Sequence, residues 1–360
     1  MKITFVLTGS GHKPVGGFKV VYEYANRLSE MGEQVTVVHP AWVRKDEPFF
    51  DRLKRSIRYV QRAADKSYLP GKWFPVDSAV HLIWAPNLSA RFIPDSDIVI
   101  ATGAPTAEWV NSYGPEKGKK FYLLQHYETW DSIGRVRLDA TYSMPLEKIA
   151  ISRWLCDIAK EKGSEAIYIP NGLEQQKFFV EKSLDSRDSQ QGIMLYHPLP
   201  EKGTDIGIRA CEIVKERHPD FKLQMFGVYG RPTNLPGWIT YEKSPSVSLL
   251  RAMYNASSFV VAPSTTEGWG LVPCEGMQCG CVLVATNAGG HREFAVHNDT
   301  ALLSPVQDAT ALARNIEEVM KNDELRKRLS SSGLRHVKKF SWEKSAGELH
   351  SVFLEAYKNV

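Results

Sequence analysis

The chain has 360 residues, of which 43% are hydrophobic and 24% charged, and its formal net charge is +4. This length is more than a single hydrophobic core usually holds, so we expect two domains. The small positive charge is too weak to indicate a nucleic-acid-binding protein. Five irregularly spaced cysteines argue against a disulfide framework or a zinc site, and no apolar run has the length of a signal peptide or of a membrane span, so we expect a cytoplasmic protein.

The first half of the chain alternates apolar runs with helical patterns. Residues 2–7 (KITFVL) form a continuous apolar run, typical of a parallel strand covered on both faces, and a helical pattern follows at 18–32. Further strands are predicted at 33–40, 81–85, 97–103, 120–126, 148–152 and 166–170, and helices at 105–114 and 153–163. This alternation predicts a doubly wound parallel sheet.

A polar, aperiodic stretch at 181–192 predicts a linker or surface loop, after which the alternation restarts. Strands are predicted at 193–198, 222–227, 257–263 and 281–286, and helices at 204–218, 246–256, 272–280 and from 309 onwards. The second half therefore predicts a second α/β domain. Two such domains facing each other would place their strand C-termini at a shared cleft, where ligands bind.

The stretch 264–280, STTEGWGLVPCEGMQCG, follows a predicted strand at the edge where open sheets bind ligands. Pro273 suits the first turn of a helix, so the backbone N–H groups near Leu271 and Val272 would be free to bind a diphosphate. Gly268 and Gly270, on either side of Trp269, would let the backbone approach the ligand closely.

Two carboxylates in this stretch, Glu267 in the loop and Glu275 in the first helical turn, are separated by seven residues. Each could accept hydrogen bonds from the vicinal hydroxyls of a sugar or a ribose. Acidic residues are also common near helix N-termini, where they are simply solvated, and the residues alone leave both interpretations open.

Several segments, in order, resemble the retaining GT-B glycosyltransferases of the E-x(7)-E type (glycosyl transferase group 1, glycosyltransferase family 4). They are VGGFKVVYEYANRLSEMGEQVTVV, IPNGLE, PEKGTDIGIRACEIV and EGWGLVPCEGMQCG followed by VLVATNAGGHREF. The resemblance covers nearly the whole chain. It implies two Rossmann-like domains with a central cleft and a nucleotide sugar as donor.

The resemblance also implies roles for residues of the second half. Glu267 would contact the hydroxyls of the donor sugar, Glu275 would bind the ribose, and Lys202 would neutralise the diphosphate. The family's second phosphate-binding cation is an arginine, and here its position holds His197, a weaker phosphate ligand when neutral. Arg231 follows a predicted strand and is the candidate for the missing cation.

In the first half, His126 follows a predicted strand and resembles the family's cleft histidine, near the reacting centre. Lone histidines are more often structural. Gly16 and Gly17 would permit close approach of the donor or the acceptor, or simply make the turn before a helix. Asn171 lies in the segment IPNGLE, which resembles the crossing between the domains, and we place it at the cleft.

No nucleophile–base pair stands out. The implied reaction is a transfer in which the leaving diphosphate helps to deprotonate the acceptor hydroxyl, so the catalytic set is Glu267, His126 and Lys202. The protein would supply positioning and stabilisation of the departing phosphate, and no metal or other cofactor is expected.

Two further motifs resemble ligand-binding sites but do not fit them. Asp95-Ser96-Asp97 spells the metal-binding D-x-D of another glycosyltransferase class, but it precedes a strand, at the edge opposite the ligand, so we expect it to cap the strand entry. The glycines of 8–17 do not have the spacing of a dinucleotide-binding loop, and the next strand ends in His39-Pro40 without an acidic residue for a ribose.

Residues 42–66 carry eight Lys or Arg against four Asp or Glu, and Phe49, Phe50, Leu53, Ile57 and Val60 fall at helical spacing. Such a basic amphipathic helix either packs on its own domain, the commoner case, or lies on an anionic membrane. The aromatic run 67–75 could line the acceptor site.

The combined prediction is a glycosyltransferase with an acceptor-binding domain at 1–170, a nucleotide-sugar-binding domain at 171–341 and a C-terminal helix, 342–360, that packs back on the first domain. It would transfer a sugar from a nucleoside diphosphate to a hydroxyl of a glycan or lipid-linked acceptor, with retention, in bacterial polysaccharide, cell-wall or glycoconjugate synthesis. The alternatives are a sugar-nucleotide epimerase or hydrolase of the same fold, and a non-catalytic nucleotide-sugar-binding module. Peripheral membrane contact is expected only through 42–74, and no nucleic acid is expected to bind.

Overall fold

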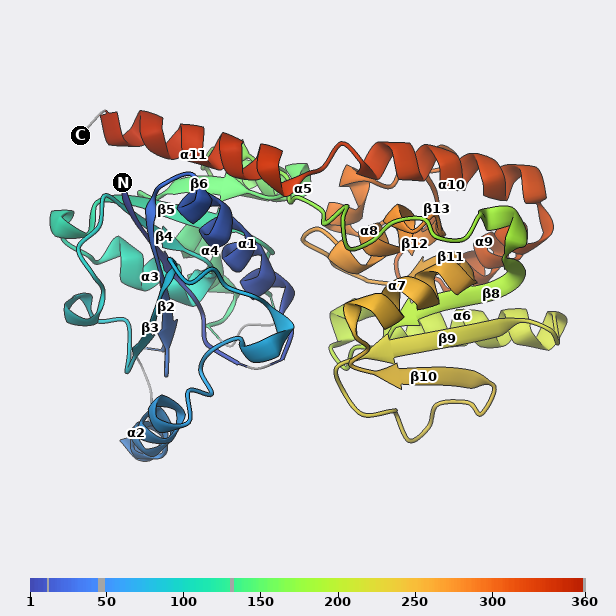
Figure 1. The fold of residues 1–360 in the computed structure, drawn as a ribbon, viewed down its shortest axis with the longest axis horizontal. Coiled ribbons are helices and arrows are strands. Elements are labelled where there is room, and N and C mark those ends of the chain that lie inside the picture. Colours follow the sequence, from blue (N-terminus) through green and yellow to red (C-terminus); the bar gives the residue numbers. More distant parts are fainter. Residues whose placement is uncertain (12, 45–48, 130–132, 359–360) are drawn as a thin grey trace. The chain divides into compact units, whose positions relative to one another are not determined.

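The computed structural model describes residues 1–11, 13–44, 49–129 and 133–358, with the side chains of 49–55 and 72 outside the description. The chain divides into two compact units, which Figure 1 shows as separate α/β bodies. Unit 1 comprises Met1–Asn171 and Trp342–Val360, and unit 2 comprises Gly172–Ser341. Each unit has its own parallel sheet, as the alternating pattern predicts.

The sheet of unit 1 has seven strands in the order β3-β2-β1-β4-β5-β6-β7. Their bounds are β1 (Lys2–Val6), β2 (Gln34–Pro40), β3 (His81–Ala85), β4 (Ile98–Ala101), β5 (Lys119–Leu124), β6 (Glu147–Ala150) and β7 (Ala166–Tyr168). The first strand is central, with Val6 paired to Val38 on one side and to Ala101 on the other. Because all pairs are parallel, the strands end at one edge, which is where a doubly wound sheet binds ligands.

The helices of unit 1 come from both ends of the chain. They are α1 (Gly16–Glu30), α2 (Phe49–Ala64), α3 (Ala104–Asn111), α4 (Arg135–Tyr142), α5 (Arg153–Glu161) and α11 (Trp342–Lys358), with short 3-10 helices at Gly71–Trp73, Ala90–Phe92 and Pro115–Lys117. The buried ring of Trp342 meets Tyr24 edge-on at 5.4 Å between centroids, and Phe353 meets Phe121 at 5.0 Å. The last helix is thus part of the core of unit 1.

The sheet of unit 2 has six parallel strands in the order β10-β9-β8-β11-β12-β13. They are β8 (Asp188–Leu195), β9 (Lys222–Gly227), β10 (Ile239–Lys243), β11 (Ser257–Ala262), β12 (Val282–Thr286) and β13 (Ala301–Ser304). Its helices are α6 (Thr204–Arg217), α7 (Val247–Ala256), α8 (Leu271–Gln278), α9 (Ala309–Lys321) and α10 (Asp323–Val337), with 3-10 helices at Leu184–Ser186, Pro200–Lys202 and Gly289–Glu293.

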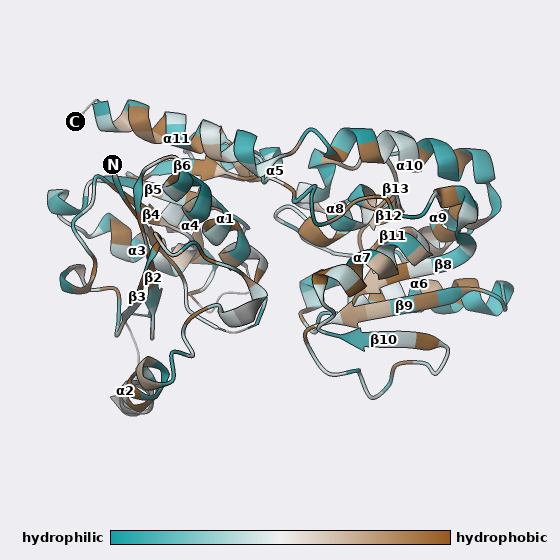
Figure 2. Cartoon of the chain, in the orientation of Figure 1, coloured by the Kyte–Doolittle hydropathy of each residue, from teal (hydrophilic) through white to brown (hydrophobic). Residues whose placement is uncertain are grey.

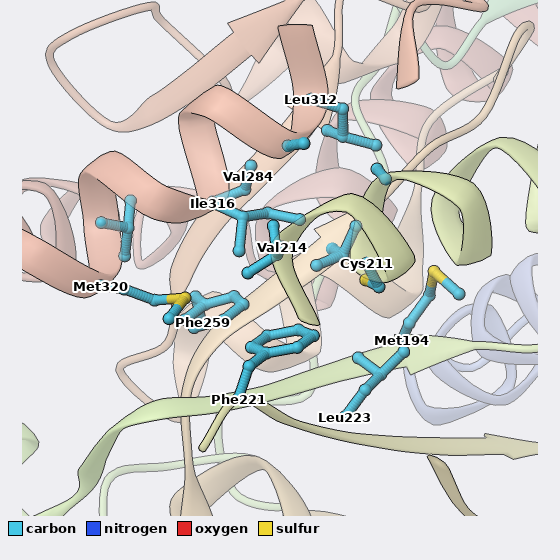
Figure 3. Packing of buried hydrophobic residues seen from close by; sticks show 14 of the residues in the cluster. Met194, Cys211, Val214, Phe221, Leu223, Phe259, Val284, Leu312, Ile316 and Met320 are labelled. Atoms are coloured by element: carbon cyan, nitrogen blue, oxygen red, sulfur yellow. The ribbon is translucent and has the colours of Figure 1, made fainter. Parts of the chain in front are cut away.

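The core of unit 2 lies between the sheet and the helices α6 and α9 (Figure 3). Phe221 and Phe259 stack with ring centroids 6.4 Å apart, and Cys211, Val214 and Ile316 of the two helices are fully buried beside them. Figure 2 shows hydrophilic and hydrophobic residues alternating along α10 and α11, as expected of helices that turn one face to a domain.

The predicted linker at 181–192 is partly wrong. Residues from Asp188 onwards belong to β8, and Arg187 is only 7% exposed. Its guanidinium donates to the backbone carbonyls of Lys182, Tyr254, Ser257 and Cys279. A charged side chain with many acceptors can be buried, and the composition of the segment does not reveal those acceptors because they come from other parts of the chain.

The helix predicted within 42–66 is present as α2, while residues 45–48 lie outside the described residues. Tyr59 stacks on Trp84 with ring centroids 5.6 Å apart, and the Trp84 indole donates to the Tyr59 carbonyl. The side chains of Ile57 and Val60 are 55% and 65% exposed. One side of α2 therefore packs on unit 1, and these two apolar residues face solvent.

The aromatic run 67–75 packs against unit 1. Tyr68 stacks on Trp84, and Phe74 is buried beside Tyr22. The Trp73 indole donates to the carbonyl of Gly11, in the loop before α1. Most of this run has a structural role, and Trp73 links it to the glycine loop.

Candidate functional site

In unit 2 the two central strands, β8 and β11, are adjacent, although the chain passes through β9 and β10 between them. The strand order reverses between these two strands, and in doubly wound sheets ligands bind at the carboxyl edge of such a point. The loops at this edge are residues 196–203 after β8 and 263–270 after β11, and they hold most of the predicted donor-site residues.

The two loops are in direct contact. Gly203 has a left-handed backbone, with φ of 63°, and a Cβ at this position would lie 2.0 Å from the carbonyl oxygen of Pro263. The N–H of Thr265 donates to the carbonyl of Glu201 at 2.8 Å. Glycine is therefore required here both by the left-handed backbone and by the short distance to Pro263. Because glycine has no side chain, the two loops can approach this closely.

This contact brings Lys202 and Glu267 together. The Lys202 ammonium donates to both carboxylate oxygens of Glu267, at 3.0 and 2.9 Å, and the hydroxyl of Ser264 donates to Oε2 at 3.2 Å. The side chains of Lys202 and Glu267 are 27% and 13% exposed. The two residues predicted to bind the diphosphate and the donor sugar are thus one ion pair in this structure.

The helix α8 begins at Leu271, with Val272 and Pro273 in its first turn, close to the predicted start. Its N-cap is Gly270, which has φ of 107° and provides no side-chain cap for the first backbone N–H groups of the helix. A Cβ on Gly270 would lie 3.0 to 3.1 Å from His291, Phe294 and Pro273. Glycine at this position is therefore required by the turn and by the packing below it.

Glu275 lies beyond the first turn of α8, as its fifth residue, and not within the first turn as predicted. Its neighbour is Tyr254, a fully buried tyrosine of α7 whose hydroxyl donates to the Val272 carbonyl at 3.2 Å. Burial raises the pKa of Tyr254 well above its usual value, and the charge of Glu275 and a side-chain hydrogen bond with it act in the same direction. Tyr254 and Glu275 therefore lie side by side, a contact that no pattern in the sequence indicates.

Two aromatic residues form the floor of the loop. The predicted donor-binding Trp269 is only 2% exposed and packs edge-on against Phe340, at 5.1 Å between centroids, so its side chain supports the loop from inside. His291 is fully buried, and its Nδ1 lies 3.0 Å from the carbonyl oxygen of Thr286. Burial lowers the pKa of His291, and the nearby charge of Glu267 partly opposes this.

His197 occupies the position of the family's arginine and is half-buried beside the pair. Its Nδ1 accepts a hydrogen bond from the N–H of Leu199 at 3.2 Å, and its ring lies edge-on to Tyr229, at 5.3 Å between centroids. Burial lowers the pKa of His197, Lys202 lowers it further, and Glu201 and Glu267 oppose the effect. At neutral pH the ring therefore adds a hydrogen-bond donor, Nε2–H, and no full charge.

Arg231, the candidate for the missing cation, is bonded within its own loop in this structure. Its guanidinium donates to the carbonyls of Ile239 and Pro236, at 3.0 and 3.3 Å, and so fastens its own loop. It lines a cavity of about 640 Å³ between α6 and the loop after β9, together with Tyr196, Tyr229 and Asp205. The ion pair of Lys202 and Glu267 does not line this cavity.

In unit 1 the predicted residues also lie at the carboxyl edge of the sheet. Gly16 and Gly17 begin α1, and a Cβ on Gly17 would lie 3.4 Å from the side-chain oxygen of Gln125, just after β5. The next residue, His126, has its Nδ1 3.1 Å from the Tyr127 carbonyl oxygen and its ring edge-on to Trp154. The glycine turn and the histidine loop are thus neighbours.

Three other positions of unit 1 lie near the ends of its strands and helices. Glu128, which no sequence motif indicates, accepts a hydrogen bond from the N–H of Ala104 at the start of α3, at 2.8 Å. Asn171, the last residue of this part of unit 1, is 1% exposed. Asp97 accepts from the N–H of Lys2 at 2.7 Å, at the start of β1, which agrees with strand-entry capping by the D-x-D motif.

Within the described residues, no group of three or more His, Cys, Asp or Glu is arranged to hold a metal ion. The same residues include no helix with the length and apolar character needed to cross a membrane.

Comparisons with known proteins give a consistent result. Residues 176–336 match the family model described as glycosyl transferases group 1. The chain is 29% identical over 216 residues to an uncharacterized glycosyltransferase of Methanocaldococcus jannaschii, and 26% identical over 224 residues to a phosphatidyl-myo-inositol mannosyltransferase of Mycobacterium tuberculosis. These alignments cover 58% and 57% of this chain and only 59% and 58% of the two relatives.

Solved structures show the same fold over the whole chain. Sucrose-phosphate synthase from Thermosynechococcus elongatus matches with a TM-score of 0.73 at 17% identity, covering 100% of both chains. Anabaena HepE in complex with UDP and glucose matches with a TM-score of 0.72 at 15% identity, covering 99% of this chain and 100% of that one. These matches show that residues 176–336 are similar to the group 1 glycosyltransferases, and that the whole chain, with its two Rossmann-like units, has the GT-B fold.

Proposed function

We propose that the protein transfers a sugar from a nucleoside diphosphate sugar to a hydroxyl acceptor. The observation that carries this proposal is the pairing of Lys202 with Glu267 beside the uncapped N-terminus of α8, at the point where the strand order of unit 2 reverses. A cation and free backbone N–H groups suit a diphosphate, and a carboxylate suits sugar hydroxyls. The proximity of this cation, this carboxylate and this helix N-terminus supports a nucleotide sugar as the ligand.

In this proposal unit 2 binds the donor and unit 1 the acceptor. Glu267 contacts the donor sugar, Glu275 the ribose, and Lys202 with the N–H groups of Leu271 and Val272 the diphosphate. In unit 1, His126 and the turn at Gly16 form part of the acceptor site. HepE has been solved with UDP and glucose, which supports a nucleotide sugar as the donor.

We further propose that the transfer retains the anomeric configuration and needs no metal or other cofactor. Lys202 and the α8 N-terminus would supply the positive potential that a departing diphosphate requires. A glycan or a lipid-linked molecule is the proposed acceptor, in bacterial glycan or glycoconjugate synthesis. The exposed Ile57 and Val60 of the basic helix α2 support peripheral contact of 42–74 with the inner face of the membrane.

A thermal-shift panel of nucleoside diphosphates and nucleotide sugars tests the donor site. A ligand at 100 times its dissociation constant stabilises the folded state by about 2.7 kcal/mol, which is readily measured. We expect at least one nucleoside diphosphate to raise the melting temperature of the wild type, and to have no effect on Lys202→Met. The control is Lys222→Met, which removes a lysine at the opposite edge of the sheet and should respond like the wild type. A panel without any such shift in the wild type would contradict the proposal.

Product analysis then separates transfer from the alternatives. With the donor found by the panel, we expect turnover only when an acceptor is added, an α-linked product from an α-linked donor by NMR, and the same rate with EDTA. Free sugar or an epimer formed without acceptor would show a hydrolase or epimerase. Nucleotide binding without turnover in any acceptor mixture would show a binding module.

A further inference from the structure

Unit 2 contains a second concave site besides the proposed donor site. It is the cavity of about 640 Å³ between α6 and the loop 228–238, which joins β9 to β10 (Figure 1). Its volume lies in the range of small-molecule binding sites. Lys202, Glu267 and Glu275 are not among the residues that line it.

The loop wall of this cavity is fastened to the rest of unit 2. The Tyr241 hydroxyl donates to the Tyr229 carbonyl at 2.7 Å, and the Arg231 guanidinium donates to two backbone carbonyls further along the chain. Leu235 is 7% exposed and belongs to the hydrophobic core that also contains residues of α6. A wall fixed at these points keeps its shape without a ligand, so binding costs little in loop ordering.

The helix wall is one side of α6. Asp205, Ile208, Arg209 and Glu212 follow one another at intervals of three and four residues, so they lie on the same side of the helix. Cys211, on the other side, is fully buried. The helix therefore turns an apolar side to the core and a mainly charged side to the cavity.

The charges of the lining residues balance. Asp205 and Glu212 provide two carboxylates, and Arg209 and Arg231 two guanidinium groups. Arg209 and Glu212 contact each other at 3.4 Å in an exposed pair, which is a weak interaction, so both can also bind a ligand. Arg231 has five N–H donors and uses two of them in the loop. Without a net positive charge, the cavity does not favour a phosphate.

The chemistry of this lining suits a neutral sugar. Each sugar hydroxyl both donates and accepts, so it can pair with a carboxylate and with a guanidinium, and the Asn234 amide offers both functions. The rings of Tyr196 and Tyr229, edge-on to each other at 6.5 Å between centroids, add an apolar surface for the C–H face of a sugar. An apolar ligand would leave the four charged groups without partners.

The cavity also lies on the opposite face of the sheet from the proposed ribose site. The helix α6 joins β8 to β9, whereas α7 and α8 join β10 to β11 and β11 to β12, in the opposite direction across the sheet. Crossovers between parallel strands are right-handed, so α6 covers one face and α7 and α8 the other. Glu275 belongs to α8, so a ribose bound there does not reach the cavity through the same face.

We propose that this cavity is a carbohydrate-binding site, separate from the donor site, that binds a neutral oligosaccharide. Asp205 and Glu212 accept hydrogen bonds from sugar hydroxyls, Arg209 and Arg231 donate to them, and Tyr229 packs against a sugar ring. This inference goes beyond the proposed function. In a protein that elongates or decorates a glycan, the site holds part of the glycan chain away from the reacting end.

Saturation-transfer NMR of the full chain with maltotriose, cellotriose, mannotriose and tri-N-acetylchitotriose tests this proposal, since it detects dissociation constants of about 1 mM. We expect at least one of these sugars to bind. Its affinity should fall by about tenfold or more in Asp205→Ala, which removes a charged hydrogen-bond acceptor. In Tyr229→Leu it should fall by about threefold or more, because the aromatic surface is lost.

Two controls locate the sugar. Glu216→Ala removes another exposed carboxylate from α6, at the other end of the helix and outside the cavity, and should bind the sugar like the wild type. An excess of UDP or GDP should leave the sugar signal unchanged, because the donor site is a different site.

Each of the other results would overturn the inference. They are no signal from any of the four sugars, displacement of the sugar by UDP or GDP, and equal affinities in the wild type, Asp205→Ala and Tyr229→Leu. Binding of uridine or guanosine that Asp205→Ala weakens would show a nucleoside site instead. These results leave the proposed function to the nucleotide panel, and sugar binding without any nucleotide binding would contradict the proposed function alone.

Discussion

At the scale of single residues, three histidines in this protein have a lowered pKa for one shared reason, which is burial. His197 and His291 lie near Lys202 and Glu267 in unit 2, and His39 is the penultimate residue of β2 in unit 1. A buried imidazole is harder to charge because it loses the solvation that stabilises the cation. These residues are therefore neutral supports at neutral pH, and they become a source of instability in acid.

His39 gives a test with a defined sign. It is fully buried between Tyr22 and Tyr68, and burial lowers its pKa to about 4 from the ordinary 6.5. Because the unfolded chain binds the proton more readily, stability from this group is complete above pH 6.5 and is lost as the pH falls towards 4. Between pH 7.5 and 5 we expect this residue to reduce the free energy of unfolding by about 2 kcal/mol.

Urea unfolding at both pH values, for the wild type and His39→Phe, measures this loss. Other groups also titrate in this range. The decisive quantity is therefore the difference between the two proteins in how much their free energy of unfolding falls between the two pH values. The variant should lose about 2 kcal/mol less than the wild type on acidification. Parallel pH dependences for the two proteins would show that His39 is already protonated or hydrated in the fold.

At the scale of elements, the proposed donor site depends on how two loops meet rather than on either loop alone. Gly203, at the start of α6, and Pro263, at the end of β11, are in contact only because their strands are neighbours in the sheet. The contact aligns Lys202 with Glu267 across 65 positions of sequence. A small change at Gly203 should therefore affect both stability and ligand binding.

We expect Gly203→Ala to lower the free energy of unfolding by about 3 kcal/mol or more, because it combines a left-handed backbone with a contact of 2.0 Å to the Pro263 oxygen. Gly163→Ala is the matched control, since Gly163 also has a positive φ, 77°, but nothing lies within 4 Å of its Cβ position. The control should cost about 1 kcal/mol and keep nucleotide binding. Urea unfolding measures the loss of stability, and titration with UDP measures the loss of nucleotide affinity. Equal losses of stability and affinity in the two variants would refute the role of the loop contact.

At the scale of the whole molecule, the chain returns at its C-terminal end to complete the unit in which it began. The helix α11 contributes Trp342, Leu349 and Phe353 to the core of unit 1, and all three are at most 1% exposed. Unit 1 is therefore complete only when the last helix has been made. This arrangement ties the stability of the first domain to the last residues of the chain.

We expect Phe353→Ala to destabilise unit 1 by about 3 to 5 kcal/mol, because it leaves a cavity against Phe121. Tyr357→Ala, on the same helix but 47% exposed, should change stability by less than about 0.5 kcal/mol. Hydrogen exchange measures the loss of stability separately in each unit. Protection should fall in β1 and β5 and remain in β11 and β12, whereas an equal fall in both sheets would contradict the assignment of α11 to unit 1.

The sequence predicted most of the fold because the strands have strong local signals. Continuous apolar runs such as 2–7 and 257–263 mark strands buried on both faces, and all the predicted strands have counterparts in the structure. The edge strands β10 and β13 and the helix α4 were missed. β10 is largely exposed, β13 is only four residues long, and α4 has a weakly amphipathic sequence, so their signals are faint.

What the sequence determined by itself was the fold class, because strand periodicity is a local feature of the chain. The spacing of Glu267 and Glu275 is also local, and it made these two residues candidates for the donor site. The tertiary structure alone decided which residues touch. It paired Lys202 with Glu267, placed Tyr254 beside Glu275, and buried Trp269, since each of these contacts joins segments distant in sequence. Charge pairing and burial depend on the packing of the whole unit, and no spacing within one segment encodes them.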